Sequence, residues 1–248
     1  MGKVLLITGG SRGIGAATAR LAAAQGYAIA VNYQRNAAAA QAVVAELEAA
    51  GARAIAVQAD VALEAEVLRM FETVDAELGR LTHLVNNAGI LEQQMRLEQM
   101  SLGRMRAVFD TNILGSFLCA REAVRRMSAR NGGSGGAIVN VSSAASRLGS
   151  PNEYIDYAAS KGAIDTLTLG LSKEVAAEGI RVNAVRPGII HTEIHARGGE
   201  PGRADRLAPL LPVRRSGTAE EVAECIVWLL SDAASYVTGA LLDVAGGR

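Results

Sequence analysis

The chain has 248 residues, half of them apolar, which is enough to bury one large hydrophobic core. Lys and Arg together number 25, as do Asp and Glu together, so the formal net charge is zero. This balance argues against a nucleic-acid partner, because proteins that bind polyanions usually carry a basic excess. The sequence shows no signal-peptide core and no uninterrupted apolar stretch of about 18 residues, the length that spans a bilayer. We therefore expect a cytoplasmic protein with neither a nucleic-acid nor a membrane partner.

The residues that could bind metal ions or form disulfides are few. Two cysteines, Cys119 and Cys225, lie far apart in the sequence and without metal-ligand spacing, so we expect each to be a buried free thiol. Three histidines, His83, His191 and His195, also lack ligand spacing, and we interpret them as incidental or pocket-lining. No metal site is predicted.

Short β-rich runs alternate with longer Ala- and Leu-rich amphipathic runs along the chain. This alternation predicts βαβ units with right-handed crossovers, and so helices on both faces of a parallel sheet. The predicted strands are residues 3–8, 28–33, 53–58, 83–86, 137–141, 181–185 and 240–244. The predicted helices are residues 13–25, 37–50, 63–78, 101–128, 154–178 and 219–230, the last with a capping box of Thr218 and Glu221. The fold class is α/β, a single Rossmann domain over residues 1–248 with a doubly wound, parallel, seven-stranded sheet.

One long segment after the sixth predicted strand lacks clear periodicity and is rich in Gly, Pro and Arg. Ligands of doubly wound sheets bind at the carboxyl ends of the strands, which is where this segment begins. We expect residues 189–215 to form a mobile cap over a substrate site.

The first predicted strand runs into TGGSRGIG, Thr8 to Gly15, and the first helix begins within this segment. A tight turn from a strand to a helix N-terminus aims backbone N–H groups and the positive end of the helix dipole at an anion. Glycines allow the backbone to turn sharply and to approach a pyrophosphate closely. The segment therefore predicts nucleotide binding. The cofactor-binding residues expected here are Gly9, Ser11, Arg12, Gly13, Ile14 and Gly15.

The second strand ends at Tyr33, and Gln34, Arg35 and Asn36 follow it. NAD-binding domains usually have a carboxylate here that binds the ribose 2′-hydroxyl, and this chain has none. Arg35, together with Arg12 from the glycine-rich turn, offers guanidinium groups that suit a 2′-phosphate. We therefore favour NADP(H), with NAD(H) as the alternative, and expect Tyr33 and Arg35 to bind the cofactor.

Tyr157 and Lys161 lie four residues apart and so share one face of a predicted helix. A phenol is a poor acid or base at neutral pH, but a nearby ammonium stabilises the phenolate and lowers the phenol pKa. Tyr157 would then exchange a proton with a substrate oxygen while a nicotinamide cofactor carries the hydride. Ser143, at the end of the fifth strand, is placed to hydrogen-bond that oxygen. Asn112 is expected to bend its helix and hold a water near Lys161.

These segments, in this order and spacing, resemble the single-domain branch of the short-chain dehydrogenase/reductase family over essentially the whole chain. The matching segments are TGGSRGIG, Asp60-Val61, NNAG from Asn86, Asn112, Ser143, Tyr157 with Lys161, and Pro187-Gly188. The resemblance implies a catalytic tetrad of Asn112, Ser143, Tyr157 and Lys161, although the segment from Ser143 to Tyr157 is one residue longer than in many members. Ser143 is preferred to its neighbour Ser142 as the matching serine.

The resemblance also implies further contacts with the cofactor. Asp60 and Val61 would hold the adenine, and Lys161 would bind the nicotinamide ribose beside Tyr157. The groove and the nicotinamide end would be lined by Asn87, Ala88, Gly89, Pro187, Gly188, Ile190 and Thr192. The residues from Val237 to the end of the chain resemble the segment that often packs in a family tetramer, which implies a homotetramer.

The substrate is less well defined by the sequence. The candidate pocket walls are residues 91–99, 147–156 and 195–214, and their polar residues favour a small hydroxylated substrate such as a sugar. The chain also resembles 3-ketoacyl-thioester reductases, whose acidic carrier protein would need a basic docking face. Arg121, Arg125, Arg126 and Arg130 are candidates for that face, although an ordinary exposed or interface helix is the commoner explanation of such a run.

We expect an NADP(H)-dependent enzyme that interconverts a secondary alcohol and a ketone, or a sugar hydroxyl and its carbonyl. A 3-ketoacyl-carrier-protein reductase is the first alternative. The alternative from another class is a sensor that binds NADP(H) without turnover, since a fold does not determine a function. The presence of both Tyr157 and Lys161 favours an enzyme.

Overall fold

The computed structural model describes residues 2–248, except for the side chain of His195. The pocket-lining role expected of His195 therefore lies outside the described residues. In the described part of the chain, seven strands form one parallel sheet in the order β3-β2-β1-β4-β5-β6-β7. The strands are β1 (Val4–Ile7), β2 (Ala28–Tyr33), β3 (Ala54–Gln58), β4 (His83–Asn86), β5 (Gly136–Val141), β6 (Ile180–Pro187) and β7 (Leu241–Val244). This arrangement confirms the predicted α/β class, with the strand order reversing between β1 and β4.

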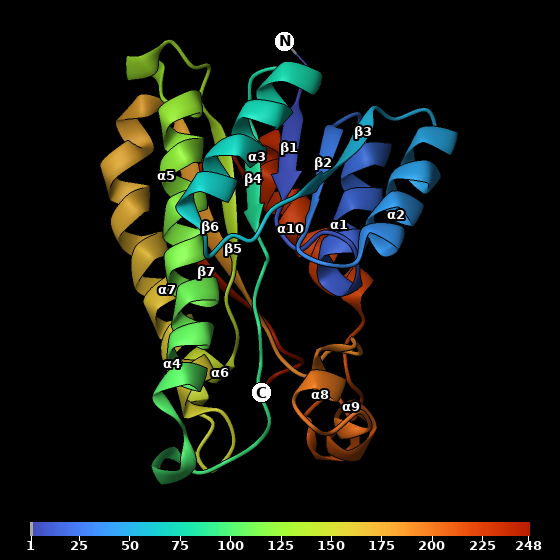
Figure 1. Cartoon of the computed structure of the whole chain (residues 1–248), viewed down its shortest axis with the longest axis vertical. Coiled ribbons are helices and arrows are strands. Elements are labelled where there is room, and N and C mark those ends of the chain that lie inside the picture. Colours follow the sequence, from blue (N-terminus) through green and yellow to red (C-terminus); the bar gives the residue numbers. More distant parts are fainter. Residues whose placement is uncertain (1) are drawn as a thin grey trace.

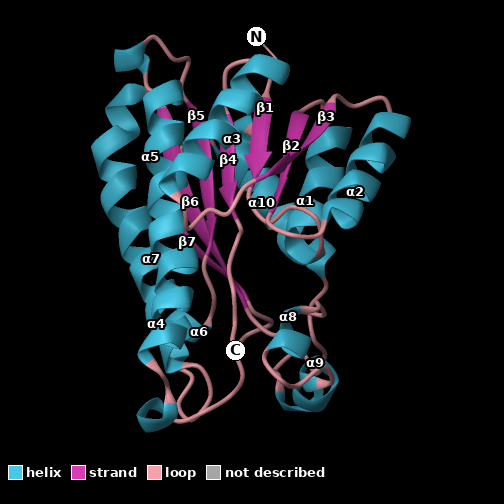
Figure 2. Ribbon diagram, in the orientation of Figure 1, coloured by secondary structure: helices cyan, strands magenta, loops and turns pink. Residues whose placement is uncertain are grey.

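Six long helices cover the two faces of the sheet (Figure 2). One face packs against α1 (Gly13–Ala24), α2 (Ala37–Ala49) and α10 (Ala219–Leu230), and the other against α3 (Glu64–Glu77), α5 (Gly115–Met127) and α7 (Ile155–Val175). The central strands are apolar on both faces, as parallel strands between two helix layers must be. Thr218 and Glu221 form the predicted capping box at the start of α10. Short 3₁₀ turns lie at Leu97–Gln99, Ala129–Asn131, Ala176–Glu178, Ala208–Leu210 and Asp232–Ala234.

The helix predicted over residues 101–128 is continuous but not regular. It consists of α4 (Leu102–Phe109), a π-helical turn (Asp110–Leu114) and α5. Asn112 lies in the π turn, where its side chain bonds to groups outside the helix. π turns occur frequently at functional sites. The irregularity predicted at Asn112 is therefore present.

Three short helices that the sequence analysis did not predict lie beyond the carboxyl ends of the strands. They are α6 (Ala145–Leu148), α8 (Ile194–Arg197) and α9 (Arg203–Leu207). In Figure 1 the strand arrows point toward the lower part of the view, where α8 and α9 (orange) lie opposite α6. The C-terminal end of the chain lies between them. Residues 189–215 thus stand where the cap was expected, and a small apolar cluster of Ile189, Ala204, Leu207 and Leu211 holds them together.

The cysteines are both free, as predicted, but only Cys119 is fully buried, while Cys225 is partly exposed. Burial raises the pKa of the Cys119 thiol to about 12, so this thiol is unreactive. No helix in the described part of the chain has the length and apolar character needed to cross a membrane. Within the same residues there is no cluster of three or more side chains suited to binding a metal ion.

Candidate active site

One cavity of about 690 Å³ opens at the carboxyl ends of the strands. It is lined by residues that follow β1, β2, β4, β5 and β6, together with Tyr157 and Lys161 from α7. All the residues predicted to be catalytic or cofactor-binding line this cavity except Gly15 and Asn112. The structure therefore brings together segments that are far apart in the sequence.

The glycine-rich turn between β1 and α1 is shaped by its own glycines and by β4. Gly9 and Gly13 have φ angles of +61° and +52°, a region that favours glycine. The Asn87 side-chain amide donates to the carbonyl oxygens of Thr8 and Gly9, each at 2.9 Å. Gly15 is buried behind the turn, where an added Cβ would lie 2.7 Å from both Asn87 Nδ2 and the Gly9 carbonyl oxygen. Gly15 was predicted to bind the cofactor, but it does not line the cavity. It instead allows α1 to pack closely against the turn.

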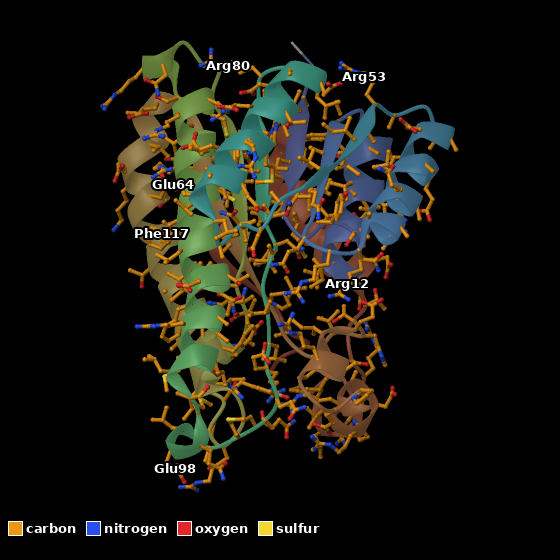
Figure 3. The ribbon with its side chains drawn as sticks, viewed as in Figure 1. Arg12, Arg53, Glu64, Arg80, Glu98 and Phe117 are labelled. Carbon is orange, nitrogen blue, oxygen red and sulfur yellow. The ribbon has the colours of Figure 1, made fainter. Side chains whose placement is uncertain are left out.

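The N-terminus of α1 is suited to an anion. Its N-cap residue, Arg12, has an extended backbone, and its side chain makes no capping hydrogen bond. Gly13 and Ile14, the first residues of the helix, line the cavity, so an anion there can meet their N–H groups. Figure 3 shows Arg12 at this end of α1, on the side that faces α8 and α9.

Two arginines border the end of the cavity nearest β2. Arg12 and Arg35 both line it, and both are exposed. Among the described residues, neither guanidinium has a hydrogen-bond or ion-pair partner. Asn36 caps α2 by accepting from the Ala39 backbone N–H at 3.0 Å, and Asp60 accepts from the Gln34 side chain at 2.6 Å. Arg12 and Arg35 therefore offer positive charge to a ligand at this end of the cavity.

Tyr157 and Ser143 both line the cavity, and the Ser143 hydroxyl is close enough to the Tyr157 phenol to act on its pKa. Ser142 is turned away and donates to Asp165 Oδ1 at 2.7 Å. Burial raises the pKa of Tyr157 to about 12, and the Ser143 hydrogen bond lowers it by less. The Lys161 ammonium was expected to lower this pKa, but it is not one of the groups that act on the phenol. The cost of burying a phenolate dominates instead.

Lys161 lies on the same side of α7 as Tyr157, and its Nζ is 5.6 Å from the centre of the Tyr157 ring. The ammonium donates to the Val141 carbonyl oxygen at 2.7 Å. Burial lowers the pKa of Lys161 to about 8, while the negative charge of Asp165 raises it by less. Asp165 is itself held by Arg186 at 2.8 Å. Lys161 is therefore largely protonated at neutral pH but loses its proton just above it, and Asp165 raises its pKa.

Asn112 is next to this group without lining the cavity. Its Oδ1 accepts from the Ile90 N–H at 2.8 Å, and its Nδ2 donates to the Ile90 carbonyl oxygen at 3.0 Å and to Ser160 Oγ at 3.1 Å. A Cβ on Gly89 would lie 3.4 Å from Asn112 Oδ1 and 3.6 Å from Lys161 Nζ. The side chain thus fixes the segment after β4 against α7.

Several polar residues of the predicted pocket walls bind one another instead of lining the cavity. Gln94 donates to Glu200, Asn152 accepts from Arg96, and the Met95 N–H donates to the Glu153 carbonyl oxygen. These pairs join loops that are more than fifty residues apart in the sequence. The walls that face the cavity are instead formed by Leu91, Leu148, Ser150, Tyr154, Ala196, Arg197, Arg203 and Arg248. The described polar residues on which the sugar prediction rested, Gln93, Gln94, Asn152 and Glu153, therefore do not line the cavity, and the sugar stays a prediction.

The arginine-rich face of the 121–130 segment is neutralised by acidic side chains. The nearly buried Glu122 pairs with Arg121, Arg125 and Arg126, at 3.2, 2.7 and 2.9 Å. Further ion pairs join Arg121 to Glu64, Arg126 to Asp75 and Arg130 to Glu178. These arginines are consequently a paired surface network and not a free basic face.

Arg248 had no signal in the sequence, because it reaches the cavity only where the end of the chain folds back against α6. Tyr154 and Arg203 fall within the predicted pocket walls, residues 147–156 and 195–214, and both line the cavity. Gln34 could have been found, since it directly follows the end of β2 beside Arg35.

Comparison with known proteins identifies the family. A family model described as enoyl-(acyl carrier protein) reductase matches residues 9–248. The oxidoreductase YgfF of Escherichia coli K12 is 62% identical over 245 residues, with 99% of both chains covered. The chain belongs to the short-chain dehydrogenase/reductase family. It is an NAD(P)-dependent dehydrogenase or reductase, and the resemblance seen in the sequence is confirmed.

Other relatives in the family carry different substrate names. A 3-oxoacyl-[acyl-carrier-protein] reductase of Synechocystis is 41% identical over 246 residues, covering 99% of this chain and 96% of the relative. A cis-4-hydroxycyclohexanecarboxylate dehydrogenase of Sinomonas cyclohexanicum is 42% identical over 245 residues, with the same coverage.

Solved structures of the family agree with the fold and with a nucleotide cofactor. A short-chain dehydrogenase of Burkholderia cenocepacia in complex with NADP has a TM-score of 0.89 at 35% identity, covering 100% of this chain and 98% of its own. A 3-ketoacyl-(acyl-carrier-protein) reductase of Brucella melitensis complexed with NADH has a TM-score of 0.92 at 31% identity, with the same coverage. Family members of this shape thus bind either nicotinamide dinucleotide.

Proposed function

We propose that the chain uses NADP(H) to interconvert a secondary alcohol and a ketone, with Tyr157 as the proton donor and acceptor. The observation that carries this proposal is the meeting of Tyr157, Ser143 and Lys161 at the cavity that the glycine-rich turn also lines. A 3-oxoacyl thioester is one ketone of this class, and two family members described above are named for it.

The residues present fit a nicotinamide dinucleotide. The unblocked N-terminus of α1 and the positive-φ turn before it would hold the pyrophosphate, and Lys161 would reach the ribose at the nicotinamide end. When bound, the cofactor supplies or accepts the hydride. Ser143 would orient the substrate oxygen, and Tyr157 would deliver the proton to it in reduction or take it in oxidation.

The raised pKa of Tyr157 keeps the phenol protonated at neutral pH, and the protonated phenol is the form that donates a proton in reduction. In the oxidative direction the phenolate must form, and the Lys161 ammonium together with the positive oxidised cofactor would then favour it. The direction of the reaction should therefore change the pH at which activity is greatest. Reduction should extend to lower pH than oxidation.

The preference for NADP(H) rests on the two unpaired guanidinium groups at the cavity end next to β2, Arg12 and Arg35. A planar guanidinium binds a phosphate through paired hydrogen bonds and is permanently charged. We expect Arg35→Ala to weaken NADPH binding by about tenfold or more while changing NADH binding little, as measured by fluorescence titration of each reduced cofactor. Equal losses for both cofactors would contradict the 2′-phosphate assignment.

The test of the proposed reaction is a substrate panel followed by the absorbance of the reduced nicotinamide. NADPH and NADH would each be offered with aliphatic and cyclic ketones, a ketoacyl thioester and aldoses, and the oxidised cofactors with the matching alcohols. Turnover of a ketone class supports the proposal and names the class. Tight NADPH binding without turnover of any member would favour the sensor alternative.

We further propose that the enzyme acts in the cytoplasm as a homotetramer. Two separate faces expose large apolar side chains. Phe117 on α5 is 45% exposed and Leu169 on α7 is 41% exposed, while Trp228 on α10 is 43% exposed and Tyr236 before β7 is fully exposed. Two self-complementary faces on one chain suffice to build a closed tetramer.

A further inference from the structure

Part of the cavity wall combines apolar side chains with three arginines. Leu91 and Tyr154 are buried in it, Leu148 adds an apolar side chain from α6, and the arginines are Arg197, Arg203 and Arg248. Arg197 is paired with Glu92 at 2.9 Å. Figure 1 marks the C-terminal end of the chain between α6 and α8, and a hydrogen bond agrees with this placement. Arg147 of α6 donates to the Arg248 carbonyl oxygen at 2.7 Å. The Arg248 backbone is thereby fixed at the cavity wall.

The guanidinium of Arg203 is occupied by bonds to other residues of the protein. It is 6% exposed and binds both carboxylate oxygens of Glu153, at 3.0 and 2.6 Å, and also Glu200 at 3.2 Å. Glu200 binds Arg206 as well. The two glutamates and these two arginines therefore cancel each other's charge and have little capacity left for a ligand.

Arg248 is the arginine of this wall whose charge is not paired. It is partly buried, and both burial and the neighbouring Arg203 lower the pKa of its guanidinium. Among the described residues, its guanidinium has no hydrogen-bond or ion-pair partner, and Glu153 is the only acid that acts on it electrostatically. A partly buried guanidinium without a partner is costly, and an anion in the cavity would relieve that cost.

We propose that the substrate carries a carboxylate and that Arg248 binds it, so that the natural substrate class is a keto acid and its hydroxy acid. This inference rests on the proposed function. The guanidinium matches a carboxylate through two parallel hydrogen bonds. A single negative charge matches the one arginine charge left unpaired here, since Glu153 and Glu200 are neutralised by Arg203 and Arg206. Leu91, Leu148 and Tyr154 would contact an apolar ring or chain between the carboxylate and the reacting carbon.

Binding can be tested without turnover. The NADP⁺-loaded protein would be titrated by calorimetry with cyclohexanecarboxylate and with cyclohexanecarboxamide, its neutral analogue. We expect the acid to bind more tightly than the amide, Arg248→Gln to weaken acid binding about tenfold to a hundredfold, and Arg248→Lys to restore part of it. Arg214→Gln is the matched control, since Arg214 is exposed, bonds only the Pro209 carbonyl oxygen and does not line the cavity. It should leave acid binding unchanged.

Kinetics with 4-oxocyclohexanecarboxylate and its methyl ester separate the two proposals. We expect Arg248→Gln to raise KM for the acid with little change in kcat, and to leave the ester unaffected. If the ester and the acid react alike, and Arg248→Gln changes neither, the carboxylate proposal is overturned and ketone reduction stands. If neither ketone reacts but Arg248→Gln still abolishes acid binding, the anion site stands and the proposed reaction fails. Acid binding that is insensitive to Arg248→Gln also overturns the site.

Discussion

At the residue scale, the chemistry depends on how tightly Lys161 holds its proton. Its pKa of about 8 means that the ammonium loses its proton just above neutral pH. The carboxylate of Asp165 opposes the effect of burial from within α7, and it is fixed there by Ser142 and Arg186. Asp165 contacts neither Tyr157 nor the Ser143 hydroxyl, so we regard it as a positioning residue that acts through Lys161.

We therefore expect Asp165→Asn to move the alkaline limit of activity to lower pH, by about 1 pH unit. The sign follows because the lost negative charge had raised the Lys161 pKa, so the variant deprotonates Lys161 earlier as pH rises. The measurement is the pH dependence of kcat/KM. Asp243→Asn is the control, because Asp243 also lies near Arg186, at 3.9 Å, but does not act on Lys161. An unchanged alkaline limit in Asp165→Asn would show that Lys161 is not the group that titrates.

At the element scale, the cofactor turn depends on the close approach of α1 to the segment that follows β4. The Asn87 amide bridges two carbonyl oxygens of the turn, and the Thr8 hydroxyl accepts from the N–H groups of Asn87 and Ala88, each at 3.0 Å. Gly15 fits beneath this bridge only because it has no side chain. A methyl group there would displace the backbone that is oriented toward the pyrophosphate.

Gly15→Ala should therefore weaken NADPH binding and destabilise the protein by about 1–3 kcal/mol. Gly103→Ala in α4 is the matched control, since its added methyl would meet only Ser101 Oγ, at 3.9 Å, and should stabilise the protein by about 0.5–1 kcal/mol. Thermal unfolding and a cofactor titration measure the two effects. Wild-type affinity in Gly15→Ala would mean that the turn tolerates the shift.

The long, periodic elements could be predicted from the sequence, and the strands Ala28–Tyr33 and His83–Asn86 and the helix Ala219–Leu230 agree at both ends. Their hydrophobic patterns and caps are local signals. The short helices α6, α8 and α9 could not be predicted, because tertiary contacts such as the Arg203–Glu153 pair and the Ile189 cluster stabilise them. The same reason explains why Gln94 and Asn152 do not line the cavity as expected, since their hydrogen-bond partners are distant in the sequence.

At the scale of the whole molecule, two layers of helices cover the faces of the sheet and leave open its carboxyl edge, where the cavity lies. The loops at the carboxyl edge bring together residues from all parts of the chain. The glycine-rich turn could therefore be predicted from its local sequence, whereas the position of Arg248 at the cavity could not. Phe117 lies on α5 (Figure 3), three residues after Leu114, and both side chains are exposed. Exposed apolar patches of this kind mark interfaces.

We expect Phe117→Glu to lower the oligomeric state, because a charge at the centre of a self-complementary face meets its own copy. Sedimentation equilibrium or light scattering would show dimers in place of tetramers. Glu64→Gln, on the nearby α3, replaces one exposed polar residue by another and should leave the mass unchanged. A wild-type protein that is monomeric at micromolar concentration would contradict the tetramer.

The central claim, proton transfer by Tyr157, is tested most directly by comparing the wild type with Tyr157→Phe. Turnover of the ketone found in the substrate panel and NADPH affinity would be measured on both proteins. The account predicts that Tyr157→Phe loses turnover by about a hundredfold or more and binds NADPH nearly as the wild type does, because only the phenol hydroxyl is removed. Turnover close to that of the wild type in Tyr157→Phe would contradict it.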